Sequence, residues 1–420
     1  MAKKKKASEE LEGDVGTKTI DSGIEFLLNH AKKNSGGHVC LGSELADRIW
    51  GIPCDYLSYR WLVDQNCYSM SRIIGVAGMK ESCKSAFAMS MAKVWIESLN
   101  ALCIYVDTEN KKSASLYRAV VGEDKLDNTM EVPAFATEDW QSHVLSAMSA
   151  ATDAPQLKNR PLIFIVDSLG GVDTIESSNR IDKEGMVNPR NTGGMVKCKS
   201  HNEFFRHVNK YLYNRPFCLL YINHLSDDPN SPIPGAKRKP GGTGQDYHAV
   251  LDLWFSAVKA TPVHKKTRGF SEKMLKIVTN KNSMGVSKRN IEIPYRWEND
   301  EQTGRIEKCW FDWDAATAMM LADDSPNGPR SRLDGIIKVT ENANKYSCKE
   351  LGLVGVTDTE MGEAIRADVN LRERISDALG INRIRIYPEM DMDAKTREIY
   401  EKSLYSKVEP KEQSAGEYEE

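Results

Sequence analysis

The fold is decided by the stretch Ile73-Ile74-Gly75-Val76-Ala77-Gly78-Met79-Lys80-Glu81-Ser82-Cys83-Lys84-Ser85. It begins with an apolar run and then matches the phosphate-binding pattern G-x-x-x-x-G-K-[ST] except at Cys83. A helical spacing of apolar residues comes next, at Phe87, Met91, Val94, Trp95 and Leu99. In a strand, loop and helix of this order, backbone N–H groups and the helix dipole bind phosphate oxygens. The sequence therefore predicts a nucleotide-binding loop, and an ordinary helix start with a lysine and a serine is the alternative.

The predicted loop gives its residues separate roles. We expect the nucleotide to contact Gly78, Ser82, Cys83, Lys84 and Ser85. Lys84 would neutralise β- and γ-phosphate oxygens of ATP, and the Ser85 hydroxyl would hold Mg²⁺.

Further apolar runs occur at intervals along the chain, at 101–106, 162–166, 217–222, 250–255 and 275–278. Continuous apolar runs suit strands that are covered on both faces. Because helical patterns separate most of them, we predict an α/β fold, a P-loop ATPase core with a mostly parallel central sheet. The last runs have no long helix between them and are expected to extend the sheet in antiparallel fashion.

Polar side chains follow three of these runs. Asp167 ends the run 162–166, as in a Walker B strand, and is expected to hold Mg²⁺ together with Ser85. Glu109 follows Ile104-Tyr105-Val106-Asp107-Thr108 and is our candidate for the base that orients the attacking water, with a helix-capping acid as the alternative. His224 follows Asn223 at the end of another run, where a γ-phosphate sensor would lie.

The pattern of composition divides the chain into segments. We predict a flexible basic arm at 1–22, an N-terminal segment at 23–66 that is a candidate for oligomerisation, and the ATPase core at 67–322. A linker around 323–329 leads to a small, mostly helical module at 330–405, and an acidic tail at 406–420 follows.

Charge and cysteine usage restrict the setting. The chain has 420 residues and a net charge of −3, so contact with nucleic acid requires a local basic patch. No apolar run reaches the ~18 residues of a membrane span, and no signal peptide is evident at the start. Nine cysteines without a CxxC pair indicate reduced thiols in the cytoplasm and no dedicated zinc site.

Such a basic patch is present at 231–289, which has twelve Lys and Arg against three acids. The loop from Pro234 to Gly244, which contains Lys237-Arg238-Lys239-Pro240-Gly241-Gly242-Thr243-Gly244, is expected to be mobile without DNA and to approach a phosphate backbone closely. The segment 180–199 contributes Arg190 and Lys197 to a first candidate DNA loop. A solvated basic face is the alternative for the patch at 231–289.

Taken together, the strand ends resemble the RecA family of recombinases, and most closely its phage UvsX branch, over about residues 45–320. That branch has a similar loop with a residue other than glycine before Lys-Ser. Glu109 falls where the family places its catalytic glutamate, Asp167-Ser168-Leu169-Gly170 resembles its Walker B, and Asn223-His224 resembles its nucleotide sensor.

The resemblance also implies roles outside these strand ends. Residues 237–244 resemble the family's second DNA-binding loop, and Lys281 falls where a lysine reaches the ATP of a neighbouring protomer. Tyr117 matches an aromatic residue that stacks on adenine.

The resemblance implies an ATP-dependent recombinase that forms a helical homo-oligomeric filament on single-stranded DNA and pairs it with duplex DNA for strand exchange and repair. Single-strand-binding or loader proteins would be further partners, in a host cytoplasm if the gene is phage-encoded. Two alternatives stay open: a hexameric helicase or packaging motor of the same fold, and a filament protein that binds nucleotide and DNA without hydrolysis.

Overall fold

The computed structural model describes residues 51–384, except 110–113, 155–159, 177–178, 180–192, 213–214, 229–230, 259–261, 266–268, 326–327 and 334. Contacts divide the chain into Met1–Leu45 and Ala46–Glu420, so every described residue belongs to the second unit. The predicted basic arm, most of the segment 23–66 and the acidic tail lie outside the described residues.

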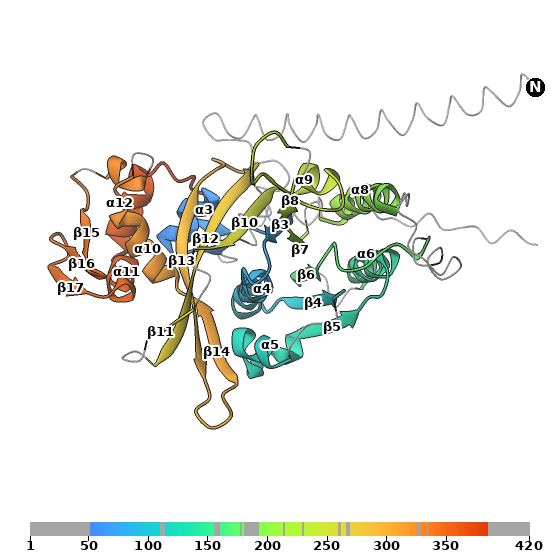
Figure 1. The fold of residues 1–420 in the computed structure, drawn as a ribbon, viewed down its shortest axis with the longest axis horizontal. Coiled ribbons are helices and arrows are strands. Elements are labelled where there is room, and N and C mark those ends of the chain that lie inside the picture. Colours follow the sequence, from blue (N-terminus) through green and yellow to red (C-terminus); the bar gives the residue numbers. More distant parts are fainter. Residues whose placement is uncertain are drawn as a thin grey trace, which may run out of the picture. The chain divides into compact units, whose positions relative to one another are not determined.

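One large sheet organises the described part of the chain (Figure 1). Its strand order is β14-β13-β12-β10-β3-β7-β6-β4-β5, and β11 pairs with β12. The strands from β10 to β5 are parallel, whereas β11 to β14 pair antiparallel. The ten strands are β3 (Arg72–Gly78), β4 (Leu102–Asp107), β5 (Thr129–Pro133), β6 (Leu162–Asp167), β7 (Phe217–His224), β10 (Leu251–Ala257), β11 (Val263–Lys265), β12 (Phe270–Asn282), β13 (Asn290–Asn299) and β14 (Ile306–Phe311).

Helices cover both faces of this sheet, which explains why the central strands are apolar without alternation. In β6, Ile163 and Ile165 pack in one hydrophobic cluster, and Phe164 and Val166 pack in another on the opposite face. The first cluster includes α3 (Leu57–Val63), α4 (Lys84–Leu99), α5 (Ala114–Val121) and α10 (Trp313–Ala322), and the second includes α6 (Thr137–Asp153) and α8 (Gly193–Leu212).

The shorter elements connect these layers. They are β1 (Ile52–Pro53), β2 (Cys67–Tyr68), η1 (Glu123–Asn128), β8 (Ser226–Asp227), β9 (Lys237–Arg238), α9 (Gly244–His248) and η3 (Pro329–Arg332).

The structure confirms the predicted α/β class and the mostly parallel sheet. All six apolar runs are strands, and the antiparallel extension is present, although β10 itself pairs parallel with β3. The sequence did not predict β5, β13 or β14. β5 lies at the sheet edge with largely exposed side chains, so it lacks the continuous apolar run by which the buried strands were recognised.

The predicted mostly helical C-terminal module is a mixed α and β structure instead. A three-stranded antiparallel sheet precedes two helices, and Figure 1 shows these elements beside α10. Leu333, Ile337 and Met361 share a hydrophobic cluster with Ala316 and Met320 of α10, so the predicted linker joins parts of one core. The elements are β15 (Val339–Asn342), β16 (Lys345–Cys348), β17 (Leu353–Val356), α11 (Asp358–Ala367) and α12 (Val369–Ala378).

A buried arginine fixes this junction. Arg296 of β13 has a side chain that is 2% exposed, and its guanidinium pairs with Asp312 before α10 and, at 2.9 Å, with Asp358 at the start of α11. Glu272 of β12 lies 3.2 Å from its Nε. A single cation therefore binds three carboxylates, and its removal would leave the buried Asp312 and two partly buried acids without their counter-charge.

We predict that Arg296→Met lowers the free energy of unfolding by about 3–5 kcal/mol, the usual cost of breaking a buried ion pair from one side. Denaturant unfolding of the full chain measures the change. Lys308→Met on the neighbouring strand β14 is the control, because its exposed side chain should change stability by no more than ~0.5 kcal/mol. Equal losses for both variants would contradict the role of Arg296.

Candidate nucleotide site at the carboxyl edge of the sheet

The parallel register brings the predicted strand ends to one edge. Gly78 of β3 pairs with His224 of β7, and Asp107 of β4 pairs with Asp167 of β6. Backbone hydrogen bonds continue beyond the strands, from Leu225 N–H to the Gly78 carbonyl at 3.0 Å. Open α/β sheets bind ligands outside the carboxyl ends of their parallel strands. The structure thus gathers the loop, the two acids and the histidine where a ligand is expected.

The loop between β3 and α4 is tightly built. A Cβ atom at Gly78 would lie 2.5 Å from Ser82 Oγ and 2.6 Å from the Phe255 carbonyl oxygen, so only glycine fits there. Cys83 has a φ of 59°, the left-handed conformation that glycine adopts without cost. The backbone at Cys83 is therefore compatible with the glycine of the usual pattern. Burial raises the pKa of its thiol to about 12, which keeps it protonated.

Lys84 lies inside the loop rather than in solvent. Its Nζ donates to the Met79 carbonyl at 2.7 Å and lies 3.4 Å from Ser82 Oγ. Burial lowers the pKa of Lys84, and the nearby Asp167 and Glu109 carboxylates oppose that shift. Both of these partners are neutral and bind the ammonium group weakly. An anionic phosphate in the loop would bind it more strongly.

Ser85 and Asp167 lie side by side, as predicted for metal ligands. Ser85 Oγ donates to Asp167 Oδ2 at 2.5 Å, and the Tyr105 hydroxyl donates to the same oxygen at 2.6 Å. Burial raises the pKa of Asp167, against the lowering effect of these two hydrogen bonds. Tyr105 was not predicted from the sequence as part of the site, although it lies two residues before Asp107 and therefore on the same face of β4.

These two oxygens fit Mg²⁺. The ion usually takes one or two protein oxygens and completes its shell with phosphates and water. Over the described residues, no group of three or more His, Cys, Asp or Glu side chains is arranged to hold a metal. The oxygen pair at Ser85 and Asp167 suits an ion that arrives with a nucleotide.

Glu109 is held by a network of donors. Its Oε1 accepts from Ser168 Oγ at 2.7 Å and from His224 Nε2 at 2.6 Å, so a carboxylate there requires the proton on Nε2. Thr108 Oγ1 in turn accepts from the Ser168 backbone N–H at 2.8 Å and donates to its carbonyl. A Cβ at Gly171 would contact Thr108 and Glu109, so the turn after β6 closes over this acid. The acid and the predicted sensor are thus in direct contact.

Asn223 connects this edge to the basic segment. Its side chain is fully buried, and its Nδ2 donates to the Pro240 carbonyl at 3.0 Å and to Gln245 Oε1 at 2.7 Å. Its Oδ1 accepts from the His224 backbone N–H at 2.8 Å. Adjacent residues of β7 therefore contact Glu109 on one side and the glycine-rich segment on the other.

The predicted adenine contact, Tyr117, packs into the core of the described residues. Its side chain is buried in α5, its ring meets that of Tyr105 edge-on, and its hydroxyl bonds to Thr129 at the start of β5. The ring is thus buried as a core residue, and its stacking on adenine stays a prediction. An aromatic residue on a short helix looks the same in sequence whether it faces the core or the solvent.

Two predicted basic residues contact backbone carbonyls. Lys281 Nζ donates to Asp246 O at 2.6 Å and to Tyr247 O at 3.1 Å, within this chain. Lys197 donates to the carbonyls of Gly170 and Val172, and burial lowers the pKa of Lys197. Arg190 lies outside the described residues.

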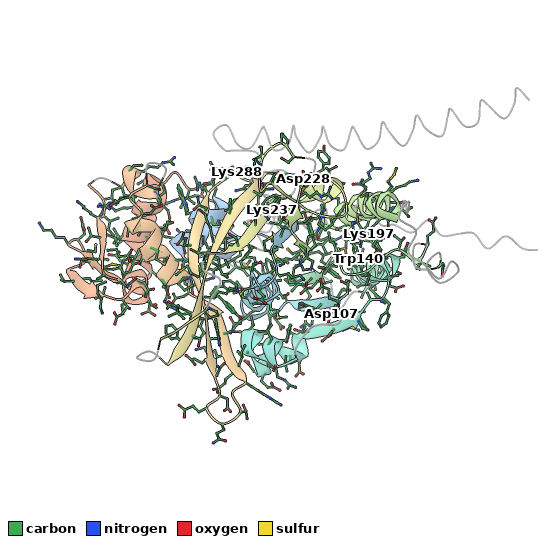
Figure 2. The ribbon with its side chains drawn as sticks, in the orientation of Figure 1. Asp107, Trp140, Lys197, Asp228, Lys237 and Lys288 are labelled. Carbon is green, nitrogen blue, oxygen red and sulfur yellow. The ribbon has the colours of Figure 1, made fainter. Side chains whose placement is uncertain are left out.

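The predicted basic patch is smaller than its composition indicates. Lys273 is buried and donates to the Glu81 carbonyl at 2.7 Å, and Arg289 pairs with Asp64 at 2.7 Å. The Lys239 side chain is only 2% exposed. Arg238 and Lys288 are exposed, and Lys237, labelled in Figure 2, is half-buried; Lys237 and Arg238 lie on a short hairpin of β8 and β9.

The glycines next to this hairpin serve close packing rather than mobility. A Cβ at Gly241 would lie 3.1 Å from His201 Nδ1, one at Gly242 would lie 2.7 Å from Cys198 Sγ, and one at Gly244 would overlap Asn202. All three partners lie on α8. Thr243 is the N-cap residue of α9. The expectation of a mobile segment at 239–244 therefore gives way to one that packs against α8.

Comparison of the sequence with known protein families finds no match, and comparison with curated proteins finds none either. Among the described residues, no helix combines the length and apolar character that a membrane crossing requires.

We predict that Asp167→Asn raises the free energy of unfolding at neutral pH, because the amide oxygen still accepts both hydrogen bonds while the buried charge is removed. Burial raises the pKa of Asp167 in the folded state. Above that pKa, the desolvated carboxylate therefore destabilises the wild-type fold. This destabilisation disappears as pH falls below the unfolded-state value near 3.8. Denaturant unfolding from pH 7 to pH 3 measures the difference.

Asp300→Asn is the control for this measurement. Hydrogen bonds from Thr303 lower the pKa of the partly exposed Asp300, so its neutralisation should not stabilise the fold. A wild-type pH dependence that Asp167→Asn leaves unchanged would show that the carboxyl carries no penalty.

Proposed function

We propose that this chain is an ATP-dependent DNA recombinase that binds Mg²⁺·ATP at the carboxyl edge of its sheet and assembles on single-stranded DNA. One observation carries the proposal: Lys84, the Ser85–Asp167 pair and the Glu109–His224 pair converge on that edge. Each is the type of group that phosphoryl transfer to water requires.

In the proposed reaction, the loop from Gly78 to Ser85 holds the β- and γ-phosphates through backbone N–H groups, and Lys84 exchanges the Met79 carbonyl for phosphate oxygens. Mg²⁺, held by Ser85 and Asp167 when it is bound, would neutralise developing charge. Glu109 takes a proton from the attacking water. His224 contacts the acting carboxylate oxygen and would respond to the charge of the γ-phosphate.

The DNA part of the proposal rests on the hairpin. Lys237 is half-buried and Arg238 is exposed, and each faces an acid, Asp227 at 2.5 Å and Asp228 at 4.0 Å. Surface pairs of this kind contribute little and are readily exchanged for phosphates. Asn223 links the same segment to the nucleotide edge, which supports a coupling between ATP state and DNA binding.

We predict that Glu109→Gln lowers DNA-stimulated ATP hydrolysis by about 100-fold or more, the usual effect of losing a general base. ATP binding should persist, because the loop and Lys84 are unchanged. Steady-state phosphate release with and without an oligothymidylate measures turnover, and a fluorescent ATP analogue measures binding.

Two variants control this experiment. Glu97→Gln alters a surface acid that pairs with Lys125 at 3.3 Å, and it should hydrolyse ATP like the wild type. Lys84→Ala should lose ATP binding together with turnover. Wild-type turnover by Glu109→Gln would contradict the role of Glu109, and turnover by a folded Lys84→Ala would contradict the nucleotide site.

A further inference from the structure

Three consecutive basic residues on the hairpin segment have different surroundings. Lys237 and Arg238 have side chains that are 30% and 52% exposed, whereas that of Lys239 is 2% exposed. Lys239 Nζ lies 2.9 Å from Asp252 Oδ1, and it also pairs with Asp246. The ammonium of Lys239 therefore points into the protein while its neighbours face outward.

Asp252 is a charged residue inside a buried part of the sheet. It lies in β10, between β3 and β12, and its side chain is 1% exposed. Its other oxygen accepts from Trp254 Nε1 at 2.7 Å and from Asn280 Nδ2 at 2.9 Å. A carboxylate buried this deeply requires a cation, and the described contacts supply Lys239 for that purpose.

The sheet makes room for this pair. A Cβ at Gly75 of β3 would lie 2.6 Å from both Asp252 Oδ1 and the Tyr221 hydroxyl oxygen. Glycine inside a strand is normally unfavourable, and it often marks a close approach by another group. Here two groups approach, the carboxylate that binds Lys239 and the Tyr221 hydroxyl.

We propose that Lys239, Asp246 and Asp252 form a charge lock that fixes the C-terminal root of the hairpin to the sheet, so that Lys239 is a positioning residue and Lys237 and Arg238 are the DNA contacts. The lock lies beside Pro240, whose carbonyl accepts from Asn223 and from Gln245. The lock and the packing against α8 thereby fix the root, and Lys237 and Arg238 of β9 are left to engage phosphates.

The lock and a phosphate contact predict opposite results for a double variant. Removing one member of a buried ion pair leaves an unpaired charge, whereas removing both leaves none. Lys239→Met should therefore disturb the root, and Lys239→Met with Asp252→Asn should restore it. If Lys239 instead bound phosphate, the double variant would bind DNA as poorly as the single variant.

The test titrates the full-length variants with a labelled oligothymidylate at several salt concentrations. Lys239→Met should weaken binding at least ~10-fold, as expected from an uncompensated buried charge. Its slope of log affinity against log salt should stay unchanged, because no phosphate contact is lost. Lys237→Ala with Arg238→Ala should flatten that slope by up to ~0.7 for each contact. The Lys239→Met/Asp252→Asn variant should return to within about threefold of wild type, and failure to do so overturns the lock.

Because this inference rests on the proposed function for its DNA readout, a second measurement is made without DNA. Hydrogen exchange of the backbone amides at 239–246 should accelerate in Lys239→Met and return toward wild type in the double variant. Unchanged exchange in Lys239→Met overturns the lock even if DNA binding changes. Absence of DNA binding by the wild type contradicts the proposed function, and the exchange results still decide the lock. Should Lys239→Met fail to fold, the double variant decides alone.

Discussion

The register of the parallel strands is the constraint on which the candidate site depends. Pairing of Gly78 with His224 and of Asp107 with Asp167 places four strand ends in one row. A shift of one residue in either pair would turn the polar ends toward opposite faces. The register is held by two hydrophobic clusters, one on each face of the sheet. The core therefore determines the position of groups that take no part in it.

The same core also affects which ligands the polar groups at this edge would bind. Lys84 is buried and Asp167 is partly buried, and this burial lowers the pKa of Lys84 and raises that of Asp167, which favours the neutral form of each. Each is thus held ready for a ligand of opposite charge, a cation for Asp167 and an anion for Lys84. Lys239 and Asp252 show the other outcome, in which two buried charges satisfy each other and serve the position of a loop.

Much of the fold was predictable from sequence, because buried parallel strands are continuous apolar runs and their polar ends follow directly. Ser85 and Asp167 were predicted together in this way, and Glu109 and His224 were predicted separately, without their contact. The strands β5, β13 and β14 and the C-terminal sheet lack such runs and were missed.

The orientation of individual side chains was harder to predict than the fold. Lys239 stands in a row of three cations and cannot be told from its neighbours by composition, and Tyr117 likewise gave no sign that it was buried. A signal for Lys239 did exist, since Asp252 interrupts an apolar run and so demanded a buried partner. The pairing of Asp252 with Lys239, thirteen positions earlier, depends on the tertiary fold.

The most direct test of the account is electron microscopy of the full chain in negative stain with single-stranded DNA and Mg²⁺, with and without ATP. The account predicts helical filaments on the DNA that require ATP, because the nucleotide edge and the basic hairpin are connected through Asn223. Closed rings would favour the helicase or packaging motor. Filaments that form equally well without nucleotide, or an absence of assembly on DNA, would contradict the central claim.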